Sequence, residues 1–496
     1  MSVREVSVQG SLTGGPVPQS RGSAVLPLSR GRPVPSPAAY WGKRLSILSA
    51  AVWTAGLAIG FERSLLVLTL VGFAAAIAGM RRPALGLLGI GMVCTLDSIS
   101  RAYLLTGGLW RWNTFNYWLL AVMLLSLPFL LQLRDLQTRL LQGILLVLII
   151  GLAFSADPRT GLQDVLNVVT LFGIMVYFAR SQGIRDAWYW MGVVCGSLAG
   201  TGGLLFHLKQ EGLPDINPNA WSFFPLTAIF TITLAFSVGG LRRGRLPLAL
   251  LAAINAVWVF LSGSRGSFLI ALVCLVFIVV QMKKSGGAVP ILGVALLIAL
   301  GVASLFVEQQ SEAVHRLDKL LDSRRSWTSR TSGRSDLALG GWYTFQEHPL
   351  GIGTGGFANA WLNLRHREGL SVFREGVYTP AHSGWIKILT ENGVPGILLF
   401  AAFVFSFAGI GWRRRREGLF LLGLLVTVSL SVAFLADEFQ GKGLWFLAAA
   451  VMTVMRRRPK LGQKPATRGT ASRETDRQAG TPATPPRRPV EGTWAP

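Results

Sequence analysis

The chain has 496 residues, of which 51% are apolar and only 15% are charged, and its mean hydropathy is positive. A net charge of +24 at pH 7 would suit a nucleic-acid-binding protein, but the Lys and Arg residues occur in short clusters between apolar runs and not on one hydrophilic domain. Composition and charge pattern therefore exclude a nucleic-acid partner and indicate a protein embedded in membrane lipids.

The two ends of the chain have the composition of disordered segments. Residues 1–42 are rich in Pro, Gly, Ser and Arg and lack the apolar segment of a cleaved signal peptide. We predict a disordered cytoplasmic arm here. Residues 457–496 are rich in Pro, Thr and Arg, and they predict a disordered cytoplasmic tail.

Between these ends, apolar runs of roughly 16 to 22 residues recur from Ser46 to Met455, and each is long enough to cross a bilayer as a helix. We predict an all-α fold, a polytopic transmembrane helical bundle of about 12–14 spans. Residues 43–249 form the N-terminal part of this bundle and residues 412–456 its last spans. The runs at 46–61 and 84–96 are short, and either could be re-entrant.

Basic clusters mark every second connection between the apolar runs. Cytoplasmic loops carry the excess of Lys and Arg in membrane proteins, so these connections and both termini are predicted to be cytoplasmic. The intervening short connections, around Glu62, Asp157, Asp215, Gly263 and Asp437, carry little positive charge and are predicted to face outward. The basic clusters are Arg81 and Arg82, Arg134 and Arg139, Arg180 and Arg185, Arg242, Arg243 and Arg245, Lys283 and Lys284, Arg413 to Arg416, and Arg456 to Arg458.

One long hydrophilic segment, residues 307–383, interrupts the apolar runs on the outward side. It holds four of the five histidines. Titratable groups that gather in one external loop, beside the ends of spans, favour a chemical role for that loop. We therefore expect one large extracytoplasmic loop that carries an active site.

The first candidate residue of this site is Arg265. Residues 262–267, Ser-Gly-Ser-Arg-Gly-Ser, form an outward turn before a new apolar run. On this side Arg265 cannot be a cytoplasmic topology signal, so it is either an anchor at the lipid interface or a phosphate ligand. A guanidinium matches phosphate oxygens with parallel N–H donors, and the small neighbours leave room for a bulky anion.

The second candidate, Arg334, lies in the long loop. It opens a stretch in which Leu337, Leu339, Trp342 and Phe345 are spaced for a helix at the membrane interface. A basic residue at a helix start opposes the helix dipole, which hints at another reason for its presence. The glycine-rich segment 347–357 follows. It lies outside any βαβ pattern and is not a Walker sequence, so we interpret it as a tight turn that folds the loop back onto the membrane.

The third candidate, His382, lies at the outward start of an apolar run. It is either a structural hydrogen-bonding residue or a general base, and two phosphate-binding arginines on the same face favour a base for glycosyl transfer from a diphosphate. The remaining histidines of the loop, His315, His348 and His366, lack regular ligand spacing, and the three cysteines lie in apolar runs. We predict no metal site and no cofactor.

In this order, the segments resemble the O-antigen ligase and O-antigen polymerase family of bacterial envelope enzymes. The resemblance rests on Ser-Arg-Gly at 264–266, Gly-Arg at 333–334, the turn at 348–353, Ala-His at 381–382 and the helix around Glu-Asn-Gly at 391–393. It covers residues 250–411, which we take as one O-antigen ligase-like region that includes the loop 307–383. Ser383 departs from the family, which most often has Asn there.

The resemblance implies a metal-independent, inverting glycosyltransferase of the bacterial inner membrane, with its active site facing the periplasm. The donor would be a polyprenyl diphosphate-linked glycan, and the acceptor a sugar of lipid A-core or the growing glycan. The roles that the family assigns fall on Arg265 and Arg334, which hold the diphosphate, and on His382, which activates the acceptor hydroxyl.

Two alternatives to the ligase remain. A polymerase of O-antigen or exopolysaccharide belongs to the same family and differs mainly in the acceptor. A solute transporter of the bicarbonate type belongs to another class, and it would be expected to place charged residues near the middle of the membrane. Because the spans look nearly free of charge, we favour the enzyme, and the single large outer loop favours the ligase over the polymerase.

Overall fold

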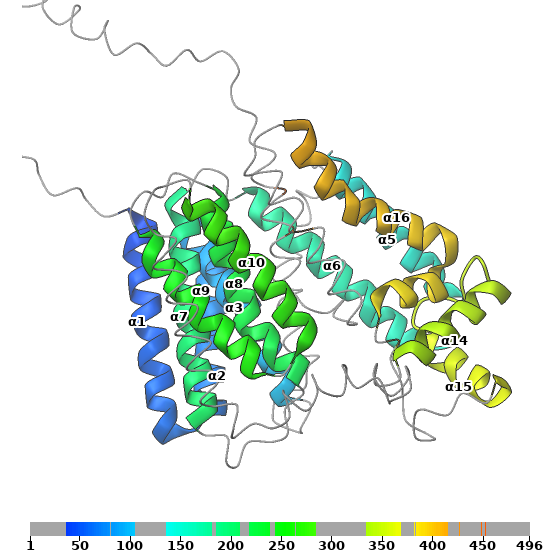
Figure 1. Ribbon diagram of the computed structural model, residues 1–496, viewed down its shortest axis with the longest axis horizontal. Helices are drawn as coiled ribbons and strands as arrows, with labels where there is room; N and C mark the ends of the chain where they lie inside the picture. The colour runs from blue at the N-terminus through cyan, green and yellow to red at the C-terminus, as the bar shows by residue number, and fades with distance from the viewer. Residues whose placement is uncertain are drawn as a thin grey trace, which may run out of the picture. The chain divides into compact units, whose positions relative to one another are not determined.

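The computed structural model describes residues 36–104 except 80, 135–180, 185–208, 218–238, 244–283 except 263, 334–368, 381 and 383–414, with isolated positions at 426, 448 and 452 (Figure 1). Every secondary-structure element in these ranges is an α-helix. Four are long and apolar enough to cross a membrane, within Phe61–Ala78, Leu136–Ala153, Asp186–Phe206 and Gly384–Gly409. The prediction of an all-α polytopic membrane protein is confirmed.

Seven helices pack into one group. They are α1 (Pro37–Ile59), α2 (Phe61–Ala78), α3 (Pro83–Leu104), α7 (Arg185–Leu208), α8 (Pro218–Val238), α9 (Arg245–Leu261) and α10 (Arg265–Lys283). The two runs that were candidates for re-entrance form α1 and α3, continuous helices of 23 and 22 residues. The first of them begins at Pro37, before the boundary expected for the N-terminal arm.

Helix α8 is the centre of this group and packs against α3, α7, α9 and α10. All its residues from 221 to 236 are buried, as expected for a helix that is apolar on every side. The threonine hydroxyls of α8 find hydrogen-bond partners within the helix, since those of Thr227 and Thr233 donate to the backbone carbonyls of Phe223 and Ile229. The surrounding core is mainly apolar, and it includes one buried carboxyl group, that of Asp97 in α3.

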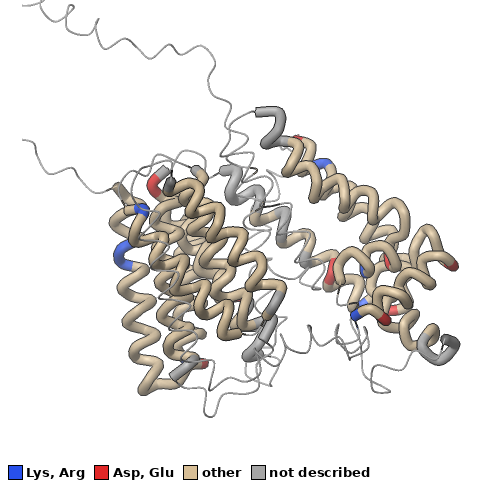
Figure 2. Tube along the Cα trace, in the orientation of Figure 1, with Lys and Arg blue, Asp and Glu red and all other residues tan. Residues whose placement is uncertain are grey.

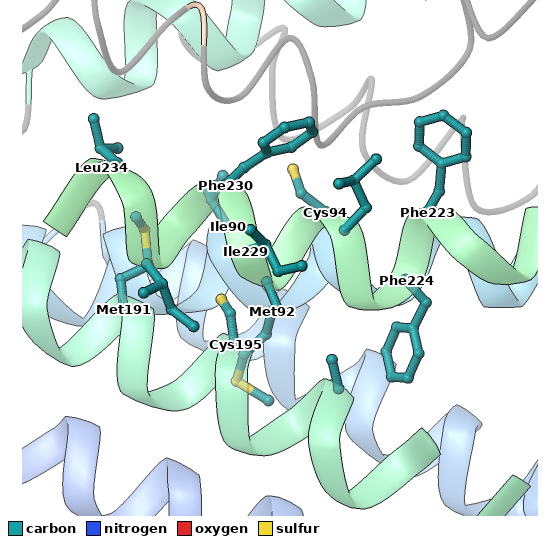
Figure 3. Packing of buried hydrophobic residues seen from close by; sticks show 14 of the residues in the cluster. Ile90, Met92, Cys94, Met191, Cys195, Phe223, Phe224, Ile229, Phe230 and Leu234 are labelled. Atoms are coloured by element: carbon teal, nitrogen blue, oxygen red, sulfur yellow. The ribbon is translucent and has the colours of Figure 1, made fainter. Parts of the chain in front are cut away.

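Buried sulfur-containing and aliphatic side chains lie between α3, α7 and α8, among them Met92, Met191, Cys195 and Ile229 (Figure 3). Cys94, Cys195 and Cys274 are all buried and free, as expected of cysteines that serve as small apolar residues.

The basic connections of the seven-helix group lie at one end. At this end, aromatic rings join four parts of the chain: the start of α1, the α2–α3 connection, and the starts of α7 and α9. The contacts are Arg82 over Trp41, Gly42 against Trp190, and Gly244 against Tyr189. Aromatic and basic residues in this arrangement are typical of a membrane interface.

The connections predicted to face outward lie at the opposite end of the group. The α1–α2 turn, the end of α7 and the start of α8 share a cluster of stacked and edge-on rings. The start of α10 lies there as well, because the Ser267 hydroxyl is 2.7 Å from that of Ser222 in α8. The two kinds of connection are therefore separated as the alternation of basic loops requires, and their assignment to cytoplasm and periplasm stays a prediction. The rings are Trp53, Phe61, Phe206, Trp221 and Phe224.

Five helices form the group that holds the candidate site. They are α5 (Leu136–Ala153), α6 (Pro158–Arg180), α14 (Arg334–Glu347), α15 (Phe357–Glu368) and α16 (Gly384–Arg414). Helix α5 packs along α16, while α14 and α15 pack at the start of α16. Charged residues of the described helices gather mainly toward helix ends (Figure 2). The connection around Asp157 and the hydrophilic loop, both predicted to face outward, lie together, since Asn359 donates to the carbonyl of Ala156.

Close backbone approach between α2 and α3 gives a test of this packing. A Cβ atom on Gly89 would overlap the amide nitrogen of Ala76. Gly89→Val is therefore expected to lower the unfolding temperature of the purified protein by several degrees, because overpacking costs about 1–3 kcal/mol. Gly409→Val is the matched control, since a Cβ there meets nothing within 4 Å. Equal unfolding temperatures for the two variants would contradict the α2–α3 contact.

Candidate functional site

The end of the five-helix group that is predicted to face outward is built around a break in α16. Gly393 has φ 58° and ψ −153°, which interrupts the helical backbone. Two residues later, Pro395 has no N–H to donate to the carbonyl of Glu391, four residues earlier. Glycine can adopt the positive φ that this break requires. The chain therefore turns at the point where the helix lacks a backbone hydrogen bond.

The glycine-rich turn before α15 supplies the missing hydrogen bonds. The amides of Ile352 and Gly353 donate to the carbonyls of Thr390 and Glu391, at 3.1 and 2.9 Å. In return, the amide of Val394 donates to the carbonyl of Pro349 at 2.9 Å. The turn and the broken helix thus satisfy one another's backbone groups, which buried polar groups require. The predicted tight turn is present, and it docks onto α16.

On its other side the turn is wedged against α5. The amide of Thr354 donates to the carbonyl of Gly151 at 3.1 Å, and its hydroxyl donates to that of Leu148 at 2.9 Å. The side-chain amide of Asn392 in turn donates to the Thr354 hydroxyl at 2.9 Å. At Gly353, with φ 96°, a Cβ would lie 2.7 Å from the carbonyl carbon of Phe154. Only glycine fits this approach.

The carboxylate of Glu391 caps the helix that follows the turn. It is buried, 3% exposed, and accepts from the amide of Phe357 at 3.2 Å and from that of Gly355. These amides lie at the start of α15, where the helix dipole favours negative charge. The side chain therefore ties the first part of α16 to α15.

A mostly buried ion pair lies beside this carboxylate. The Nζ atom of Lys387 in α16 lies 2.7 Å from Oδ2 of Asp164 in α6, and the side chains are 18% and 10% exposed. Lys387 is one helical turn before Glu391, and the charges of all three residues act on one another. The expectation of nearly charge-free spans is wrong here. A carboxylate and an ammonium four residues apart in an apolar run were the sequence signal for this cluster.

Helix α14 begins at Arg334, as predicted, and crosses the start of α16. Its buried residue Leu337 belongs to an apolar cluster with Phe357, Trp361 and Ala381. At the crossing, the Thr390 hydroxyl of α16 lies 3.2 Å from a backbone carbonyl of α14. The inward face is Leu337, Gly340, Gly341 and Thr344, whereas Leu339 and Trp342 of the predicted apolar face are exposed.

The side chain of Arg334 is half-buried at the first position of α14. Within the described residues it has no carboxylate partner. A guanidinium at the rim of a packed cluster, not neutralised by these neighbours, has the chemistry to bind an anion.

His382 lies outside the described residues, but both of its chain neighbours are described. Ala381 is buried in the cluster of Leu337. Ser383 precedes α16: its hydroxyl accepts from the amide of Ile386 at 3.5 Å, and its carbonyl accepts from that of Lys387 at 2.9 Å. Ser383 therefore acts as the helix cap, a role that Asn fills equally well. The departure from the family at this position fits the local structure.

Arg265 is the first residue of α10 in the seven-helix group, and its side chain lies outside the described part. Its neighbours form a buried chain of hydroxyls, in which Ser264 donates to Ser267 at 3.1 Å and Ser267 meets Ser222 at 2.7 Å. A Cβ on Gly266 would meet nothing within 4 Å, which agrees with room for a bulky group beside Arg265.

The structure thus places Leu337, one helical turn after Arg334, in one apolar cluster with Ala381, the residue before His382. Arg265 belongs to another helix group. A site formed by all three residues stays a prediction. In the described ranges no three His, Cys, Asp or Glu side chains are grouped to hold a metal ion. Metal independence stays a prediction as well.

Comparison with known proteins supports the family suggested by the motifs. Residues 248–401 match the family model of the O-antigen ligase domain. The matched range runs from α9 through α10, α14, the glycine-rich turn and α15 into α16, and so includes the break and all three candidate residues. A search of curated proteins finds no match. The chain is an integral membrane protein that carries, over residues 248–401, the domain of the O-antigen ligase family.

Proposed function

We propose that the protein is an inner-membrane glycosyltransferase that moves a glycan from a polyprenyl diphosphate to a sugar hydroxyl on the periplasmic face. The O-antigen ligase domain supports glycosyl transfer of the ligase or polymerase type. Both termini are cytoplasmic in this proposal, because the basic connections lie at the end of the helices opposite to the candidate site.

The observation that carries the proposal is the contact between the starts of α14 and α16. Arg334 is one helical turn before Leu337, so the two residues share a face of α14. Leu337 packs in one cluster with Ala381, the residue before His382. An arginine and a histidine that belong to two chain segments packed against each other can serve a single reaction centre.

The chemistry follows from these residue types. The acceptor oxygen forms a bond to the anomeric carbon while the bond from that carbon to the diphosphate oxygen breaks, with inversion. A ring nitrogen of His382 takes the proton of the acceptor hydroxyl. Negative charge grows on the departing diphosphate, where Arg334 and Arg265 stabilise it most as the bond breaks. No metal ion or cofactor is needed for this balance.

The acceptor in our proposal is a sugar of lipid A-core, which makes the protein a ligase. A polymerase would use the same donor site with the growing glycan as acceptor. A transporter would use a broken helix differently, by offering freed carbonyls to a substrate or ion. Here the carbonyls of Thr390 and Glu391 accept from the glycine-rich turn, which removes this argument for transport.

Removal of the proposed base is the first test. His382→Ala is expected to lower the transfer rate about 10²- to 10⁴-fold in a purified assay with a polyprenyl diphosphate glycan, with normal membrane accumulation. His348→Ala is the control, because that side chain is exposed at the end of α14. Wild-type transfer by His382→Ala would exclude this mechanism.

Substitution of Arg334 separates the charge of its side chain from its hydrogen-bonding geometry. Arg334→Lys keeps a positive charge but loses the bidentate donors, so the Michaelis constant for the donor should rise and the rate should fall about tenfold or more. Arg139→Lys, at an exposed position near the opposite end of the group, should leave both constants unchanged. An Arg334→Ala protein with full activity would remove the diphosphate role.

Acidity and chelation give a third test. An imidazole base must be neutral to accept a proton, and free imidazole titrates at about pH 6.5. The transfer rate of the wild-type protein should therefore fall as the pH drops through this region. EDTA should leave the transfer rate unchanged. Loss of transfer in the presence of EDTA would show that a metal ion takes part.

A further inference from the structure

The first part of α16, Gly384–Asn392, is a short helical segment that the break separates from the rest of the helix. At Gly393 the regular backbone ladder stops, and the carbonyls of Thr390 and Glu391 bond to the turn instead of to the next helical turn. The orientation of this segment is therefore set by its own contacts and not by the remainder of α16.

Among the described residues, three polar side-chain contacts join the segment to other helices, and each reaches a different helix. A fourth, from Asn392 to the Thr354 hydroxyl, reaches the glycine-rich turn. The Thr390 hydroxyl reaches α14, the Glu391 carboxylate reaches the start of α15, and the Lys387 ammonium reaches Asp164 in α6. The contact to α6 differs from the others because it joins two charged groups. It also joins the segment to the α5–α6 side of the group.

Stability alone gives little reason for an ion pair at this place. Taking both charges out of water costs several kcal/mol per ion, and a well-packed apolar pair of similar volume is often as stable or more stable. An ion pair instead fixes the relative position of the two helices that carry it. With the ammonium and the carboxylate 2.7 Å apart, α6 and the first part of α16 can slide little against each other. The pair suits a segment whose orientation matters more than its stability.

We infer that the Asp164–Lys387 ion pair is a positioning element of the transfer reaction. Through it, α6 sets the orientation of Gly384–Asn392 and so of His382, which immediately precedes the cap of this segment. The inference rests on the proposed role of His382. Displacement of a catalytic group by about 1 Å can cost about 10² in rate, so a residue that touches no substrate can control the reaction.

The double variant Asp164→Leu with Lys387→Met tests the inference because it removes both charges of the pair, while Glu391 keeps its hydrogen bonds from the amides of Gly355 and Phe357. We expect the turnover number to fall about 10- to 100-fold, with the Michaelis constant for the donor changed less than about threefold. Lys387→Arg keeps a cation and should be at least about tenfold faster than the double variant. Wild-type turnover by the double variant, or a loss confined to the Michaelis constant, would overturn the inference.

Two further variants serve as a substitute and as a control. Asp164→Asn has nearly the shape of the wild type and replaces the double variant if that protein does not accumulate, with an expected loss of about tenfold. Ser406→Ala is the matched control, because it removes a 3.2 Å hydrogen bond from Gln137 to α16 beyond the break. Its turnover number should stay at the wild-type level.

A measurement that needs no activity separates this inference from the proposed function. A His382→Cys protein is labelled with a membrane-impermeant thiol reagent, while the native Cys94, Cys195 and Cys274 are buried. The apolar pair should change the labelling rate at position 382 several-fold, and Ser406→Ala should not. An unchanged rate would refute positioning even if His382 proves essential, whereas an active His382→Ala protein would refute only the proposed base.

Discussion

The exchange of backbone hydrogen bonds at Gly393 is the constraint on which the candidate site depends. Pro395 leaves the carbonyl of Glu391 without its helical donor, and the membrane offers no water to replace it. The amide of Gly353 fills this need. Because one N–H is missing in α16, a turn from the hydrophilic segment 307–383 packs against α5 and α16, together with the flanking helices α14 and α15.

Around this exchange, the side chains of Glu391 and Lys387 each have a partner that complements their charge. The Glu391 carboxylate lies on the amides at the start of α15, and the Lys387 ammonium lies on Asp164. Such groups are expensive inside a membrane protein and are tolerated where they are paired or serve a function. Their place beside the segment that follows His382 links the electrostatics of the fold to the proposed chemistry.

Much of this arrangement was accessible from the sequence, because local signals determine it. The start of α14 at Arg334 and the tight turn at the repeated glycines followed from helix and turn patterns. The ion pair did not follow, since Asp164 and Lys387 are far apart in the chain and only packing shows that they meet. The break in α16 had a local signal in Pro395, but its consequence depended on a partner turn that no single segment reveals.

The backbone exchange at Gly393 also bears on how the protein is made. The glycine-rich turn precedes α16 in the chain, and α5 precedes both by about two hundred residues, which gives the contact a long sequence separation. In the predicted orientation, the turn crosses the membrane before α16 is inserted, and the carbonyls at the break in α16 then find their hydrogen-bond donors in a turn that has already been translocated. Docking of the glycine-rich turn onto α16 would therefore be a late step of biogenesis, after α5, the turn and α16 have all been synthesised.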